Sequence, residues 1–184
     1  MGTDKAFLEL GGRTLLTRAI EMAREVTGQV RLLGDRHKFG RFGMVVEDVY
    51  PGSGPLGGIH AGLMSTITEL NLMLAVDLPF IRPDFVRYLL AEAARAGAVV
   101  TVPRSGGIFQ PLCAVYRKEF SEVAERALLA GKNKIGALFG EVDVRVIDDY
   151  ELERAGFESA IFRNPNTPQE WEDVKLDFEE KKLN

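Results

Sequence analysis

One stretch of nine residues places the strongest constraint on how this 184-residue chain can fold. Residues 72–80, LMLAVDLPF, hold five consecutive apolar residues that run into one carboxylate, Asp77, and Pro79 follows two positions later. A short apolar run that ends at a turn signal predicts a buried strand, typical of a parallel sheet. Open α/β sheets bind ligands outside the carboxyl ends of such strands, so Asp77 is a candidate ligand-binding residue. The alternative is an aspartate that only caps the next loop or helix.

The rest of the sequence alternates short apolar strands with amphipathic helices. Strands are expected at residues 30–33, 44–46, 98–102, 110–116 and 142–147, and helices after Thr14, at 59–67, 83–96, 120–129 and 133–139, and from 169 onward. This alternation predicts βαβ units and an α/β fold with a mostly parallel central sheet. No linker or internal repeat interrupts it, so we expect one domain over residues 1–184.

Composition excludes several classes of function. The formal net charge of −4 gives no support for binding to nucleic acid or to an anionic membrane surface. Cys113 is the only cysteine, which fits a reducing cytosol, and no apolar run approaches the ~18 residues of a transmembrane helix. The charged first twelve residues do not match a signal peptide, so we expect a cytoplasmic protein. His37 and His60 alone do not predict a zinc site, whereas oxygen ligands leave a magnesium site open.

Two carboxylates and one glycine-rich loop could carry chemistry. Asp48 closes one expected strand as Asp77 closes another, so both emerge at one sheet edge if their strands are parallel neighbours. Proteins usually hold magnesium with one or two carboxylates plus substrate phosphates. The loop that contains Gly57 and Gly58 precedes a helix, and its backbone amides could cradle an anion. The alternatives are turn chemistry for the aspartates and a tight turn into a closely packed helix for the glycines.

Four other features have simple structural explanations beside a functional one. Lys5 could neutralise phosphate charge as a point cation, although a solvated surface lysine is the default. His60 is expected to face solvent or to be satisfied in the core, and Cys113 is expected to be a small core residue. The loop at residues 104–107 could line a cleft or serve only as a turn.

The order of the motifs is more specific than any one of them. In chain order the sequence carries MGTDKA at residues 1–6, ED at 47–48, GPLGG at 54–58, DLPF at 77–80, QPL at 110–112 and FRNPNTP at 162–168. Over almost the whole chain, this series resembles the molybdenum cofactor guanylyltransferase family, enzymes that build molybdopterin guanine dinucleotide. The resemblance implies a three-layer, Rossmann-like nucleotidyltransferase fold with a mostly parallel central sheet. It also implies transfer of GMP from GTP to molybdopterin, with release of pyrophosphate.

The resemblance implies roles for individual residues, position by position. Asp77 resembles the family's ligand for Mg²⁺ and nucleotide, and Lys5 resembles its phosphate-binding lysine, so these two residues are expected to carry catalysis. Asn164 and Asn166 match the two asparagines that face the acceptor, molybdopterin. The residues expected to bind the nucleotide are Lys5, Asp35, Asp48, Gly57, Gly58 and Asp77.

The sequence departs from the family pattern in two places. Family members begin with a strand and a loop of the form LAGGxSxRMG, and this sequence starts at the Met of that pattern. We therefore expect an exposed flank on a central strand and a weaker hold on a triphosphate, because the glycine amides of that loop are not in the sequence. In addition, Asp35 stands where the family has a nucleoside-contacting asparagine.

Two other functions stay open. Another nucleotidyltransferase of the same fold, such as a cytidylyltransferase, would use a different nucleotide or acceptor. A catalytically silent module would bind the cofactor through Asn164 and Asn166 and pass it to other cofactor-biosynthesis proteins.

Overall fold

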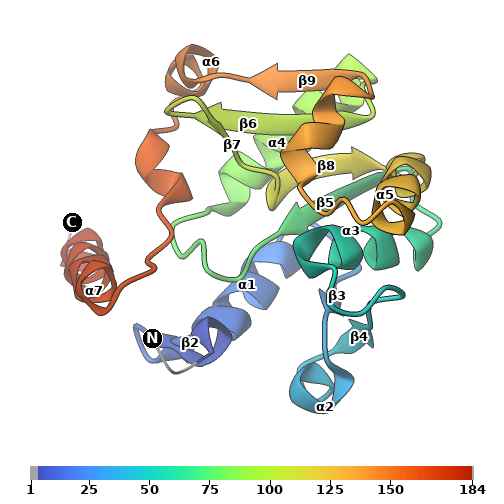
Figure 1. Ribbon diagram of the computed structural model, residues 1–184. Helices are drawn as coiled ribbons and strands as arrows, with labels where there is room; N and C mark the ends of the chain where they lie inside the picture. Colours follow the sequence, from blue (N-terminus) through green and yellow to red (C-terminus); the bar gives the residue numbers. More distant parts are fainter. Residues whose placement is uncertain (1–3, 184) are drawn as a thin grey trace.

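The computed structural model describes residues 4–183, which form a central five-stranded sheet with helices on both faces (Figure 1). The strands of this sheet are β5 (Leu70–Leu74), β6 (Val100–Ser105), β7 (Ile108–Phe109), β8 (Cys113–Arg117) and β9 (Val144–Ile147). Two smaller pairs are the hairpin β1 (Glu9–Leu10) with β2 (Arg13–Thr14) and the parallel pair β3 (Arg31–Leu33) with β4 (Met44–Val46). The α-helices are α1 (Leu15–Arg24), α2 (Arg36–Phe39), α3 (Gly54–Met64), α4 (Pro83–Ala96), α5 (Phe120–Leu129), α6 (Asp149–Arg154) and α7 (Pro168–Leu183). The 3₁₀ helices are η1 (Lys5–Phe7), η2 (Ile135–Gly140) and η3 (Ser159–Phe162).

The α/β architecture agrees with the sequence, but the expectation of a mostly parallel sheet is wrong. Strand β8 lies between β5 and β6 and is antiparallel to both, and β7 is antiparallel to β6. In this sheet only β9 pairs in parallel, with β6. The physical reason is the shortness of the connections between these strands. A tight turn at Gly106 and Gly107 joins β6 to β7, and three residues separate β7 from β8. A parallel pairing needs a crossover of a dozen or more residues, so β8 must return antiparallel.

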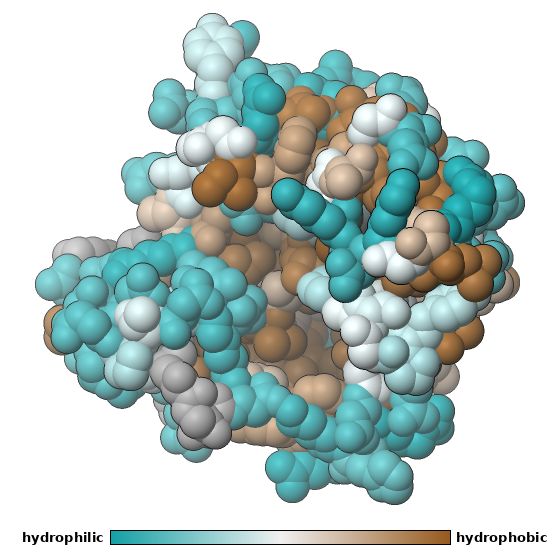
Figure 2. Space-filling view, viewed as in Figure 1, coloured by the Kyte–Doolittle hydropathy of each residue, from teal (hydrophilic) through white to brown (hydrophobic). Residues whose placement is uncertain are grey.

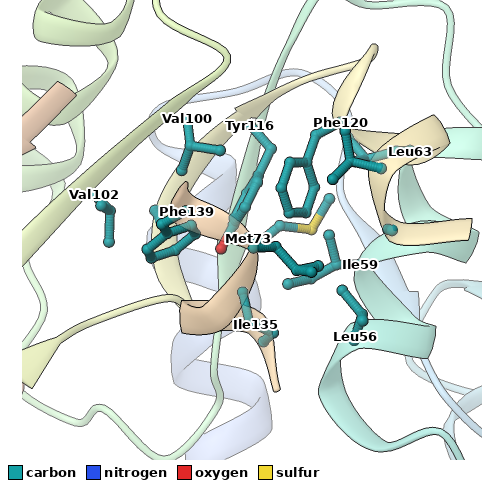
Figure 3. Packing of buried hydrophobic residues seen from close by; sticks show 14 of the residues in the cluster. Leu56, Ile59, Leu63, Met73, Val100, Val102, Tyr116, Phe120, Ile135 and Phe139 are labelled. Atoms are coloured by element: carbon teal, nitrogen blue, oxygen red, sulfur yellow. The ribbon is translucent and has the colours of Figure 1, made fainter. Parts of the chain in front are cut away.

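The core has two layers, one on each face of the sheet. Successive residues of a strand point to opposite faces. Ala114 and Tyr116 of β8 pack with α3 and α5, in the cluster drawn in Figure 3. Their neighbours Cys113 and Val115 pack instead with α4 and with the segment around Phe162. The sheet and the helical layer on each of its faces together form the expected three-layer arrangement.

Strands β3 and β5 each keep one edge without a strand partner among residues 4–183. Strand β3 pairs with β4, and β5 pairs with β8. Between them lies a groove of about 620 Å³, lined by both strands and by helices α1 and α4. Unpaired strand edges beside apolar side chains promote edge-to-edge association. Strand β5 is an edge strand of the five-stranded sheet, so the expectation of an exposed flank on a central strand stays a prediction. Across the described residues, no helix is both long and apolar enough to cross a membrane.

Candidate functional site

The ammonium group of Lys5 lies at the centre of a cluster assembled from distant parts of the chain. Lys5 Nζ donates to Asp77 Oδ2 at 3.2 Å, to Asn164 Oδ1 at 2.9 Å and to Asn166 Oδ1 at 2.6 Å. An ammonium group has three N–H donors, so these three acceptors use its full capacity. Four residues that the sequence singled out separately thus meet at one point, which we call the Lys5 cluster.

Two short elements hold the charged pair of the Lys5 cluster in place. Lys5 is the first residue of η1, and the side chain of Asp4 caps this turn by accepting a hydrogen bond from Ala6 N at 2.9 Å. Ala6 is buried against Leu16 of α1. Asp77 follows the last residue of β5 by three positions, at the end of a strand as the sequence predicts. Both side chains are therefore anchored by ordered backbone.

The two asparagines lie in the segment between η3 and α7, which a capping box makes rigid. Glu170 Oε2 accepts hydrogen bonds from Asn166 N at 2.7 Å and from Thr167 N at 3.0 Å, and Glu170 N donates to Thr167 Oγ1 at 3.2 Å. The N–H of Asn166, followed by that of Thr167, holds the pKa of Glu170 below its ordinary value. This arrangement turns the amide oxygens of Asn164 and Asn166 toward Lys5. Glu170 was not among the predicted site residues, although the pattern Thr-x-x-Glu at residues 167–170 is a capping-box signal.

The electrostatics of the Lys5 cluster favour a binding role over a stabilising one. The side chains of Lys5 and Asp77 are 27% and 20% exposed. Ion pairs that solvent can reach contribute only ~0–1 kcal/mol to stability, because water and salt screen them. A cation at the surface with one charged and two neutral acceptors can exchange those partners for the oxygens of an anionic ligand. The face seen in Figure 2 is hollowed between the positions of α7 and α3, with a hydrophobic floor and a hydrophilic rim.

Asp48 lies apart from the Lys5 cluster, at the amino end of α3. It follows β4, and its carboxylate packs on the helix backbone, because a Cβ added to Gly57 would lie 3.4 Å from Asp48 Oδ2. Asp48 makes no hydrogen bond or ion pair with any residue in the described part of the chain. Burial raises the pKa of its carboxyl group above the ordinary value. A carboxylate that loses hydration and has no protein partner is suited to a cation brought by a ligand.

The expectation that Gly57 and Gly58 expose their amides in a loop is wrong. Helix α3 begins at Gly54 rather than at residue 59, so both glycines lie inside its first turns. Close packing requires a glycine at position 57 only: a Cβ on Gly57 would lie 3.1 Å from Ser53 Cβ, whereas one on Gly58 would make ordinary contacts of 3.7–3.9 Å. The structure therefore brings Gly57 and Gly58 next to Asp48, through packing of the helix against the end of β4.

Asp35 has a structural task in this fold. It caps the four-residue helix α2, since Asp35 Oδ1 accepts hydrogen bonds from His37 N at 2.7 Å and from Lys38 N at 3.3 Å. No hydrogen bond or ion pair joins it to Lys5 or Asp48. Its position after β3 still places it at a strand end, which is where the sequence expected it.

Two residues that the sequence assigned to ordinary structure are buried. Cys113 is fully buried, which raises the pKa of its thiol to about 12, so it is a core residue and not a nucleophile at neutral pH. His60 is 1% exposed, and its ring lies 5.3 Å from that of Tyr50. Both ring nitrogens of His60 lack a hydrogen-bond partner among the described residues. The expectation of a core position is therefore confirmed, whereas the expectation that its ring nitrogens are hydrogen-bonded there is wrong.

Comparison with known proteins decides the family. The model of the MobA-like NTP transferase domain matches residues 1–146. The chain belongs to this family. A probable molybdenum cofactor guanylyltransferase from Pelotomaculum thermopropionicum is 36% identical over 172 residues, which are 92% of this chain and 83% of that relative. The crystal structure of molybdopterin-guanine dinucleotide biosynthesis protein A from Archaeoglobus fulgidus has a TM-score of 0.86 at 24% identity and covers 97% of this chain and 92% of its own. A cytidylyltransferase from Thermus thermophilus, which acts on 2-C-methyl-D-erythritol 4-phosphate, has a TM-score of 0.72 at 19% identity and covers 97% and 95%.

Membership of the MobA-like NTP transferase family makes the protein a nucleotidyltransferase and gives the Lys5 cluster a chemical context. Enzymes of this class move a nucleotidyl group between phosphate oxygens, so they must neutralise charge on phosphates. Within the described residues, no three or more His, Cys, Asp or Glu side chains gather in a way that could hold a metal by themselves. A divalent cation would therefore need oxygens from the nucleotide and from water as well as from Asp77 or Asp48.

Proposed function

We propose that this protein transfers GMP from GTP to molybdopterin, releasing pyrophosphate and forming the guanine dinucleotide cofactor. The observation that carries the proposal is the Lys5 cluster, in which the proposed phosphate-binding residues contact those proposed to face the acceptor. The names of the relatives from Pelotomaculum and Archaeoglobus support the same substrates. The proposal keeps the expected cytoplasmic location and expects no nucleic-acid or membrane partner.

In the proposed reaction, a terminal phosphate oxygen of molybdopterin attacks the α-phosphorus of GTP. The bond from the α-phosphorus to the bridging oxygen breaks, and pyrophosphate leaves with the electron pair. Lys5 donates to phosphate oxygens and stabilises their negative charge, while Asn164 and Asn166 orient the acceptor. No protein nucleophile is needed, since positioning and charge neutralisation supply the rate enhancement.

The carboxylates of Asp77 and Asp48 are suitable ligands for a magnesium ion, which we propose as the cofactor. Asp77 has one carboxylate oxygen outside its bond to Lys5, and Asp48 has no partner among residues 4–183. Both are hard oxygen donors, and magnesium commonly binds one or two carboxylates, substrate phosphates and several waters. When bound, the ion would supply positive charge to the phosphates. Asp77 would hold it, with Asp48 as a second acidic contact to the nucleotide.

The proposed nucleotide-binding residues also include Gly58, and its role can be tested by adding a methyl side chain at this position. We expect Gly58→Ala to raise the free energy of unfolding by about 0.5–1 kcal/mol, because alanine favours a helix and its Cβ has room. Because the same methyl group would lie 3.7 Å from Asp48 Oδ1, a proposed nucleotide contact, we expect it to raise KM for GTP roughly fivefold. Chemical denaturation and steady-state kinetics measure the two effects. The matched variant is Gly57→Ala, whose Cβ would crowd Ser53 and lower stability; an unchanged KM in Gly58→Ala would remove Gly58 from the nucleotide pocket.

The choice of nucleotide is tested by offering each NTP with molybdopterin as acceptor. We expect pyrophosphate release from GTP to exceed that from ATP, CTP or UTP by at least about 100-fold in kcat/KM, because a site built to hydrogen-bond one base rejects the others strongly. A preference for CTP would favour the cytidylyltransferase alternative. Retention of molybdopterin without pyrophosphate from any NTP would favour the silent binding module.

A further inference from the structure

A second pocket is connected to the Lys5 cluster through the segment that holds Arg163 and Asn164. It has a volume of about 590 Å³ and is lined on one side by the β6–β7 turn and on the other by α6 and η3. The two sides are tied together, because Gly106 N donates to both carboxylate oxygens of Asp149, at 2.9 Å and 3.2 Å. The turn at residues 104–107, for which the sequence left open a cleft or a plain turn, does contribute Ser105 and Gly106 to this pocket. The transfer reaction described above does not use any residue of the pocket.

The position of the pocket connects it to the acceptor side. Arg163 lines the pocket, and the next residue, Asn164, accepts the hydrogen bond from Lys5 Nζ at 2.9 Å. Consecutive Cα atoms lie about 3.8 Å apart, so the wall of the pocket and the Lys5 cluster meet at this point of the chain. A molecule with a flat ring and a phosphate-bearing tail could place the ring in the pocket and its phosphate near Lys5.

The chemistry of the lining fits an aminopyrimidinone ring. Phe157 and Phe162 form an apolar part of the wall, although both rings are buried at 7% exposure and pack edge-on against Phe85. The Glu153 carboxylate makes no hydrogen bond or ion pair within the described part of the chain, so its oxygens are open acceptors. Gln110 uses one amide N–H for the carbonyl of Ile108 at 3.4 Å, which leaves its amide oxygen free. An aminopyrimidinone presents two adjacent N–H donors to such a carboxylate and ring carbonyl and N–H groups to an amide.

We propose that this pocket binds the pterin ring of the acceptor, with Glu153 accepting hydrogen bonds from the aminopyrimidinone edge. The inference rests on the proposed function for the identity of the acceptor. A guanine ring carries the same edge, but two residues proposed for the nucleotide lie elsewhere, Asp48 after β4 and Gly57 on α3, and neither is part of this pocket. The volume lies within the range of about 300–1,000 Å³ that ligand pockets occupy.

Binding of a pterin that carries no phosphate tests this pocket independently of the Lys5 cluster. We expect the full-length protein to quench the fluorescence of 6-hydroxymethylpterin, and Glu153→Gln to weaken this binding more than about tenfold, since a charge-assisted hydrogen bond is lost. Ser159→Trp, which fills the pocket from its rim, should abolish it. Glu158→Gln, at an exposed neighbour outside the lining, should bind the pterin as the wild type does.

Three outcomes would overturn the assignment. These are no pterin binding by the wild type at about 1 mM, undiminished binding by both pocket variants, and displacement of the pterin by GTP, which would assign the pocket to guanine. Failure of the proposed function has a different signature. In that case pterin binding would persist and the protein would release no pyrophosphate from GTP with molybdopterin.

Discussion

Replacing Lys5 with methionine is expected to lower kcat/KM for GMP transfer by about 100- to 1,000-fold, or about 3–4 kcal/mol, while the protein stays folded. Methionine keeps a straight apolar stem but has no ammonium group. Phosphate charge that develops during transfer would then meet the uncompensated carboxylate of Asp77, 3.2 Å from where Nζ lies. Because the pair is partly exposed, its loss should cost at most about 1 kcal/mol of stability. Steady-state kinetics and thermal denaturation measure the two effects.

The matched control for this variant is Lys175→Met. Lys175 forms an exposed ion pair with Glu172 at 2.8 Å on α7, outside the Lys5 cluster. Its substitution should change kcat/KM by less than about twofold, since surface pairs contribute little. Lys5→Arg should recover part of the lost activity by restoring the charge, although its planar fork cannot reproduce three bonds made by a single nitrogen. If Lys5→Met retained more than a tenth of the activity, Lys5 would not be the phosphate-binding residue.

The parts of the fold that follow from local pattern were predictable. The apolar run before Asp77 contains most of β5, which ends at Leu74, two residues before the run does, and the helix at residues 83–96 is closed by Gly97 in a left-handed conformation with φ of 72°. Thr14 caps α1, as its side chain accepts a hydrogen bond from Thr17 N. In each case the signal lies within a few residues of the structure that it specifies.

The antiparallel insertion of β8 was not predictable from strand spacing alone. The segment at residues 110–116 was taken as one strand, whereas the structure divides the region into β7, a three-residue connection and β8. Two-residue strands such as β7 carry too little pattern to be recognised. The helices α2 and α6, with four and six residues, were missed for the same reason, although Asp35 and Asp148 are regular N-caps.

The composition of the Lys5 cluster shows where sequence reasoning stops. Lys5 and Asn164 are 159 positions apart, and no local pattern predicts that they touch. Motif order identified both residues through the family resemblance, but their contact is a property of the packed chain. The glycines at 57 and 58 show the reverse case, because a glycine-rich loop and the first turns of a closely packed helix have the same sequence signature.

Replacing Asp77 with asparagine is expected to have the largest effect, a loss of at least about 1,000-fold in kcat, or about 4 kcal/mol. Asparagine keeps the shape of the side chain and an amide oxygen for Lys5, so the cluster can still form. It removes the negative charge that is proposed to hold magnesium. The variant should therefore keep its affinity for GTP measured without metal and lose the increase in affinity that magnesium gives. Calorimetry with GTP, with and without Mg²⁺, separates these two quantities.

Two comparisons make this prediction specific to Asp77. Asp173→Asn on α7 removes a carboxylate that, within the described part of the chain, accepts one hydrogen bond, from Gln169 at 3.2 Å, and it should leave kcat unchanged. The double variant Lys5→Met with Asp77→Asn should lose less than the product of the two single losses, because each single change leaves the other group without its partner. A fully multiplicative loss would mean that the two groups act independently. Unchanged turnover in Asp77→Asn would refute the metal site, and with it the role of the strand end that constrains this fold.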